Sequence, residues 1–167
     1  RAALSKNPRL PMHRNWLGLV LRRRGDLEGA EAEFKKALEA APDLVGVMAN
    51  LGSLYLQEQK HQEAVDILRR AIGKDPRNLE SRTNLIVALA MTRDLSGARR
   101  LVDEAENAGP RVPGLYNALA YALRLGGRAE EALEMLDRSL RIDPRQPEAL
   151  RLRAEIERGL PAASPYR

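Results

Sequence analysis

The side chains that could carry catalysis or bind a metal are few and scattered in this sequence. Its 167 residues include no cysteine and only two histidines, His13 and His61. Without cysteine the chain can form neither a disulfide nor a thiolate metal site. Neither histidine has a second histidine at the spacing of a zinc ligand pair, and Gly126-Gly127 lacks the remaining residues of a phosphate-binding loop. We therefore expect no catalytic residue, no cofactor, no metal and no enzymatic activity.

Residues suited to binding, by contrast, recur along the chain. Four asparagines fall at nearly regular intervals: Asn15, Asn50, Asn84 and Asn117. An asparagine side chain donates and accepts hydrogen bonds at once, so a row of them can pair with the backbone of an extended peptide. The alternative is that each asparagine only caps local backbone.

One basic cluster, Arg22-Arg23-Arg24, stands inside the body of the chain. It is either a solvated helix end favoured by the helix dipole, or an anchor for an acidic group.

A period of 34 residues organises these positions. One ladder with this step is made of prolines: Pro8, Pro42, Pro76, Pro110 and Pro144. Two further ladders are Leu17, Leu51, Leu85 and Leu119, and Ala30, Ala64, Ala98 and Ala132. A fixed period of this size indicates one supersecondary unit that is copied and stacked.

The repeat resembles the tetratricopeptide repeat, a helix–turn–helix unit of the same length. Repeat one matches its signature offsets with Leu17-Gly18, Gly25, Ala30, Phe34, Ala37 and Pro42. Repeats two and four match similarly, whereas repeat three diverges at Ile86 and Glu106. The resemblance implies an all-α fold, an α-solenoid in which antiparallel helix pairs stack into a right-handed superhelix.

The register of the repeats gives the expected domain organisation. We expect a single solenoid over residues 1–160, followed by a disordered tail at 161–167. Its parts are an N-terminal half-repeat (1–10), four repeats (11–44, 45–78, 79–112 and 113–146) and a capping helix (147–158). In repeat one the helices should span about 12–24 and 28–40. The breaker-rich residues 109–114 predict the weakest joint.

Small and acidic residues predict how each helix pair is built. Gly18 and Gly52 should lie where the second helix of the repeat crosses the first, because the absence of a side chain permits close approach. Asp26 and Asp94 occupy the position of an N-cap for that second helix.

Charge and hydropathy limit the classes of partner. The net charge is +5, but residues 1–10 alone carry three positive charges and no negative one. The repeats are therefore nearly neutral, and we expect no nucleic-acid partner, because duplex binding needs clustered cations. No apolar run approaches the roughly 20 residues that span a bilayer, so we expect no direct membrane insertion. The cytoplasm is the default compartment for a cysteine-free fragment without a signal.

The resemblance also implies where a ligand would bind. In the family, the first helices of the repeats line a concave groove. The corresponding positions here are Asn15, Leu19, Arg22, Asn50, Leu56, Asn84, Val87, Met91, Asn117, Tyr121 and Arg124. Neighbouring groove offsets add Trp16, Arg23, Ser53 and Gln57. We expect the apolar members to form a solvent-exposed floor, unless packing between repeats covers them. The cations of the family's carboxylate-clamp type are absent from their offsets.

These patterns predict a non-enzymatic protein–protein interaction module that binds a peptide or helix of a partner in the groove. One alternative is a regulatory or docking extension of a larger enzyme whose catalytic domain is absent here. Another is a self-assembling scaffold, a homo-oligomer formed through the N-terminal edge that the half-repeat leaves unpaired.

Overall fold

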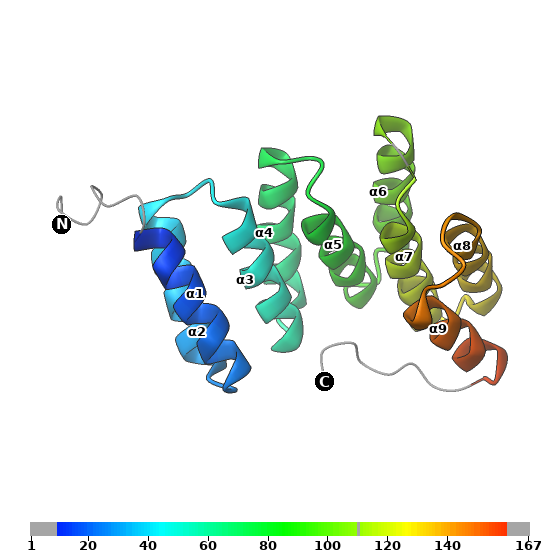
Figure 1. Cartoon of the computed structure of the whole chain (residues 1–167), viewed down its shortest axis with the longest axis horizontal. Helices are drawn as coiled ribbons and strands as arrows, with labels where there is room; N and C mark the ends of the chain where they lie inside the picture. Colours follow the sequence, from blue (N-terminus) through cyan, green and yellow to red (C-terminus); the bar gives the residue numbers. More distant parts are fainter. Residues whose placement is uncertain (1–9, 110, 160–167) are drawn as a thin grey trace. The chain divides into compact units, whose positions relative to one another are not determined.

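A computed structural model describes residues 10–109 and 111–159, and all regular secondary structure in these ranges is α-helical (Figure 1). The first helices of the repeats, and the terminal helix, are α1 (Leu10–Arg23), α3 (Val45–Gln57), α5 (Leu79–Met91), α7 (Pro113–Leu125) and α9 (Pro147–Glu157). The second helices are α2 (Leu27–Ala40), α4 (His61–Lys74), α6 (Leu95–Ala108) and α8 (Ala129–Ile142).

The helix ends follow the period of the sequence. Second helices end at Ala40, Lys74, Ala108 and Ile142, which lie 34 residues apart. The ladder prolines at 42, 76 and 144 come two residues later, where a residue without an N–H cannot continue the helix. Pro110, residues 1–9 of the predicted half-repeat and residues 160–167 with the predicted tail lie outside the described residues. A helix, α9, lies at the position predicted for the capping helix.

The chain divides into two compact units, residues 1–81 and 82–167, so the division falls within α5. In the first unit α1 packs on α2 and α3, and α3 packs on α2 and α4. In the second unit α7 packs on α6, α8 and α9. This division lies away from residues 109–114, where the weak joint stays a prediction; α6 and α7 on either side of them contact each other within one unit.

Glycines on the first helices make room for the second helices, as the sequence predicts. A Cβ on Gly18 would lie 2.6 Å from Phe34 Cε1, and one on Gly52 would lie 2.5 Å from Leu68 Cγ. Phe34 and Leu68 are completely buried. Each glycine thus leaves a hole that a large core side chain of the paired helix fills.

The predicted N-caps are confirmed in repeats one and three. The Asp26 carboxylate accepts a hydrogen bond of 2.9 Å from the Gly29 N–H, and the Asp94 carboxylate accepts one of 2.8 Å from the Gly97 N–H. Each bond satisfies a backbone donor that has no partner within the helix.

The turn between the two helices of a repeat uses a left-handed residue at the same offset in all four repeats. Gly25 and Gly127 have φ of 85° and 75°, and Gln59 and Arg93 have φ of 61° and 66°. A side chain costs about 1–2 kcal/mol in this region, and glycine does not incur that cost. The turn geometry of repeats two and three therefore persists without the residue that suits it best.

This comparison predicts opposite effects for two reciprocal substitutions. Gln59→Gly should raise the free energy of unfolding by up to about 1 kcal/mol, because it removes the left-handed strain. Gly25→Gln should lower it by about 1–2 kcal/mol, and no neighbour lies close enough to clash with the new Cβ. Urea unfolding followed by circular dichroism measures both; shifts in the same direction would contradict the explanation.

The core predicts a second contrast. Leu51 of the leucine ladder is 3% exposed, whereas Arg69 on α4 is exposed. Leu51→Ala should reduce stability by about 2–5 kcal/mol through lost burial and a cavity. Arg69→Ala should change stability by less than about 0.5 kcal/mol. Equal urea midpoints for the two variants would show that the repeat register is wrong.

Candidate peptide-binding surface

The C-terminal turn of α1 is bound to α3 through one arginine. Arg22 Nε donates to Gln57 Oε1 at 3.0 Å, and its Nη2 donates to Ser53 Oγ at 3.0 Å. Both acceptors are neutral, so the bridge orients the guanidinium group without compensating its charge. Arg22 therefore fixes two first helices to each other.

A concavity of about 590 Å³ opens beside this bridge, on the first unit. Its lining residues are Trp16, Leu19, Val20, Arg22, Arg23, Arg24 and Gln57. Trp16 is 64% exposed and Val20 is 46% exposed. We call this the Trp16 concavity. The family offsets included most of its residues but missed Val20 and Arg24, and the position of Val20 one turn after Trp16 was the available signal.

The two candidate asparagines of the first unit, Asn15 and Asn50, form a hydrogen bond with each other. Asn50 Nδ2 donates to Asn15 Oδ1 at 2.9 Å, from α3 to α1. Asn15 is buried and Asn50 is half-buried. One donor of Asn50 and one acceptor of Asn15 are therefore already used between α3 and α1.

The other two candidate asparagines, Asn84 and Asn117, belong to the second unit. Asn117 Nδ2 donates to Gln146 Oε1 at 2.8 Å, at the residue that precedes α9. The other polar atom of this side chain, Asn117 Oδ1, is buried and has no hydrogen-bond partner among the described residues. Asn84 on α5 is half-buried.

Two members of the predicted apolar floor are buried instead of exposed. Leu56 is 3% exposed and Val87 is 7% exposed. The expectation failed because α3 and α5, which carry these residues, are buried around most of their circumference. In α3 every residue from Val47 to Leu56 is buried except the half-buried Asn50, and in α5 every residue from Leu85 to Ala90 is buried. Leu19, Met91 and Tyr121 are half-buried.

Arg124 in the second unit forms an ion pair with the terminal helix α9. Its Nη1 lies 2.7 Å from Glu155 Oε2 on α9, and the arginine side chain is 6% exposed. The hydrogen bonds from Arg124 and Arg151 lower the pKa of the Glu155 carboxyl. Burial raises the pKa of the neighbouring Tyr121. This end of the predicted groove is therefore engaged in holding α9.

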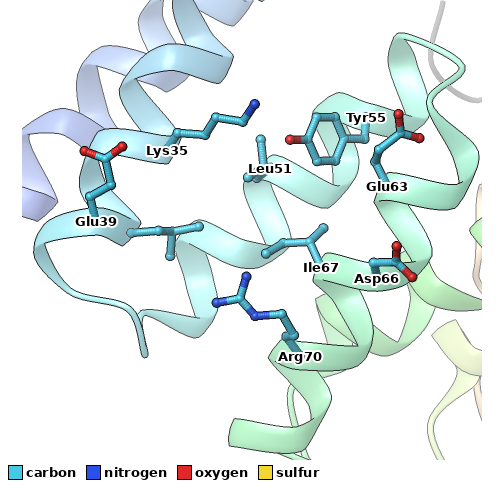
Figure 2. Close-up of a pocket in the computed structure, with 9 residues that line it drawn as sticks. Lys35, Glu39, Leu51, Tyr55, Glu63, Asp66, Ile67 and Arg70 are labelled. Atoms are coloured by element: carbon cyan, nitrogen blue, oxygen red, sulfur yellow. The ribbon is translucent and has the colours of Figure 1, made fainter.

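A second concavity, of about 470 Å³, lies between α2 and α4, with α3 as its floor (Figure 2). Its charged rim consists of Lys35, Glu39, Glu63, Asp66 and Arg70, and its apolar lining consists of Leu38, Leu51, Tyr55 and Ile67. We call it the α2–α4 cleft. Sequence reasoning missed it because that reasoning followed only the first helices, although Glu63, Asp66, Ile67 and Arg70 share one face of α4 by their spacing.

Glu31 joins three elements beside this cleft. It accepts hydrogen bonds from Lys60 Nζ at 2.8 Å and from the Tyr55 hydroxyl at 3.3 Å, and it forms an ion pair with Lys35. Burial acts to raise the pKa of Glu31, but the hydrogen bonds from Lys35 and Lys60 outweigh burial, so its pKa lies below the ordinary value. The ionised carboxylate is thus part of the folded structure.

Neither metal binding nor membrane spanning finds support in residues 10–109 and 111–159. This part of the chain contains no group of three or more histidine, aspartate or glutamate side chains placed to hold a metal ion. None of its helices is both long enough and apolar enough to cross a bilayer.

Models of the tetratricopeptide repeat match residues 9–77, 55–120 and 113–156, and together they extend over nearly all of the described helices. The chain belongs to the tetratricopeptide repeat family. The resemblance seen in the sequence is confirmed, as is the all-α repeat fold class. Domains with the fold of this family act as protein–protein interaction modules.

Comparisons with individual TPR proteins show the same fold at low sequence identity. A solved structure of a thermophilic TPR protein from Thermus thermophilus is 22% identical, with a TM-score of 0.73 over 89% of this chain and 82% of that one. The structure of YrrB, described as a TPR protein with an unusual peptide-binding site, is 20% identical, with a TM-score of 0.61 over 95% of this chain and 81% of that one.

A curated human relative, the protein O-mannosyl-transferase TMTC1, is 25% identical over 134 residues. The match covers 80% of this chain but 15% of the relative's length.

The Glu31 contacts predict a pH-dependent stability. A carboxyl whose pKa is lowered by folding stabilises the protein above its unfolded pKa, about 4.5, and this contribution is lost as the pH falls through the folded pKa. Glu31→Gln should therefore be less stable than wild type by on the order of 1 kcal/mol at pH 7, and the difference should shrink below about pH 4.5. Urea midpoints from pH 7 to pH 3 measure this difference in stability.

Glu28→Gln, at an exposed position of the same helix, is the control. A wild-type advantage that is constant across this range would contradict the assignment.

Proposed function

We propose that this TPR chain is a non-enzymatic interaction module that binds a peptide or an amphipathic helix of a partner protein along the first helices of its repeats. The observation that carries the proposal is the α1–α3 surface. There the amide pair of buried Asn15 and half-buried Asn50, together with the Arg22 bridge, adjoins a concavity in which Trp16 is exposed.

The composition of this surface suits a peptide. Asparagine, serine and glutamine side chains both donate and accept hydrogen bonds, as does the peptide backbone. The bond between Asn15 and Asn50 holds the two amides in fixed positions, so less conformational freedom is lost when a ligand binds. An exposed tryptophan beside them offers a large apolar contact, and exposed apolar patches of this kind mark interaction sites. The TPR structure described as having an unusual peptide-binding site supports the same class of ligand.

A second candidate is that this chain is the docking or regulatory extension of an enzyme. It is supported by the relative named as an O-mannosyl-transferase, of whose length the match covers 15%. The α1–α3 surface would then recruit a substrate or a regulator to a catalytic domain elsewhere in the protein. This candidate has the same binding surface as the first and differs only in the role of the bound partner.

The test replaces the two asparagines of the α1–α3 surface, Asn15→Ala and Asn50→Ala together. Helical content should be unchanged, because alanine is the better helix former. The free energy of binding to a partner recovered by pull-down should become less favourable by about 0.5–1.5 kcal/mol for each lost hydrogen bond. Titration of that partner by calorimetry measures the effect, and Arg69→Ala with Arg70→Ala on α4 is the control pair.

Two results would count against the proposal. Unchanged affinity of the asparagine variant, with a loss in the α4 pair, would place the partner on the second helices. Light scattering across a dilution series tests self-assembly, and a concentration-dependent mass without any other partner would favour the scaffold alternative.

A further inference from the structure

The Trp16 concavity carries an apolar contact that no described residue covers. Trp16 is the single tryptophan of the chain and is 64% exposed. Met12 and Val20, one turn away on either side, are 44% and 46% exposed. Because residues four apart lie on one face of a helix, these three side chains form a continuous apolar stripe along α1. Tryptophan is also among the side chains that contribute most to binding at protein interfaces.

The rim of the same concavity is uniformly positive. Arg22, Arg23 and Arg24 follow one another, and none forms an ion pair with a residue in the described part of the chain. The two hydrogen bonds of Arg22 go to neutral acceptors, and the lining contains no carboxylate. The C-terminal dipole of α1 offsets only about half a charge. A concave surface with cations on one side concentrates its potential on whatever enters it.

We propose that the Trp16 concavity binds an acidic segment of a partner protein, one that carries a large apolar side chain among aspartates or glutamates. The apolar side chain packs against Trp16 and Val20, and the carboxylates accept hydrogen bonds from Arg23 and Arg24. This inference rests on the proposed function and specifies the chemistry of its ligand. It uses the last turn of α1, which differs from the offsets of the family's carboxylate clamp.

A single-stranded nucleic acid also stacks on tryptophan and pairs with arginine, but the rest of the surface disfavours it. Sites for such strands follow the backbone with a continuous positive groove. Here the polar groups that continue from the concavity along α3, namely Asn50, Ser53 and Gln57, are uncharged. Three cations match a short acidic stretch better than a polyanion whose charge continues on both sides.

The test is a selection of peptides from a phage-displayed random library on the full chain. Recovered sequences should be enriched in aspartate and glutamate next to a large apolar residue. Synthetic versions without tryptophan should change the emission of Trp16 as they bind, because its indole leaves water. The affinity of these peptides should fall about tenfold or more in Trp16→Ala and in the double variant Arg23→Glu with Arg24→Glu. Binding to Trp16→Ala, which lacks the tryptophan, is measured with a fluorescently labelled peptide.

The matched control is Arg69→Glu with Arg70→Glu, two consecutive arginines that α4 exposes elsewhere on the same unit. This pair changes the net charge by the same amount, and it should leave peptide affinity within about twofold of wild type at about 0.15 M salt, where distant surface charges are screened. An equal loss in both arginine pairs would show a response to net charge, or binding in the α2–α4 cleft, and would overturn the inference.

The remaining outcomes separate this inference from the proposed function. Peptides without acidic enrichment that still lose affinity in the asparagine variant would overturn the acidic ligand and leave the proposed function standing. Tighter binding of an oligothymidylate than of any selected peptide, lost in Arg23→Glu with Arg24→Glu, would replace the peptide with nucleic acid. A selection that yields no binder would count against both proposals.

Discussion

At Gly18 and Gly52 a side chain from the second helix occupies the space in which a Cβ would stand. Phe34 and Leu68 are completely buried at these places, so neither helix can slide along its partner without opening a cavity, and close-packed interiors tolerate cavities poorly. This fit fixes the register of each helix pair. Once the register is fixed, so is the stripe of each first helix that remains available to a ligand.

The turns show how the pair geometry dominates local preference. Gln59 and Arg93 adopt the left-handed conformation that Gly25 and Gly127 provide without strain, because the helices on either side are already held by their packing. Ladder residues and capping aspartates allow the helix bounds to be predicted to within about two residues. Such features are local or strictly periodic, and they require no knowledge of neighbouring helices.

The surface was less predictable, because it depends on which helices adjoin. The sequence placed Asn15 and Asn50 at similar positions of their repeats. It could not show that their side-chain amides form a hydrogen bond of 2.9 Å with each other. Leu56 was expected in solvent, since its offset faces the groove in the family, yet α3 is buried on nearly every side. The α2–α4 cleft depends on three helices at once, so no single periodic pattern pointed to it.

Ion pairs join packed helices of the first unit, whereas the lining of the concavity at the end of α1 contains three arginines and no carboxylate. Glu33 on α2 pairs with Arg14 on α1 and with Lys36 of its own helix. Glu31 on α2 pairs with Lys35 of its own helix and with Lys60, which precedes α4. In each pair the opposite charges lie close together, so their fields largely cancel. Among the described residues, Arg22, Arg23 and Arg24 at the end of α1 line a concavity without such carboxylates.

A body that is nearly neutral overall can therefore present a local positive field. Net charge summed over a repeat hides that field, because Coulomb interactions depend on the distance between individual charges and are screened within about 8–10 Å in physiological salt. The arrangement of charges, more than their number, is what the proposed acidic ligand would recognise.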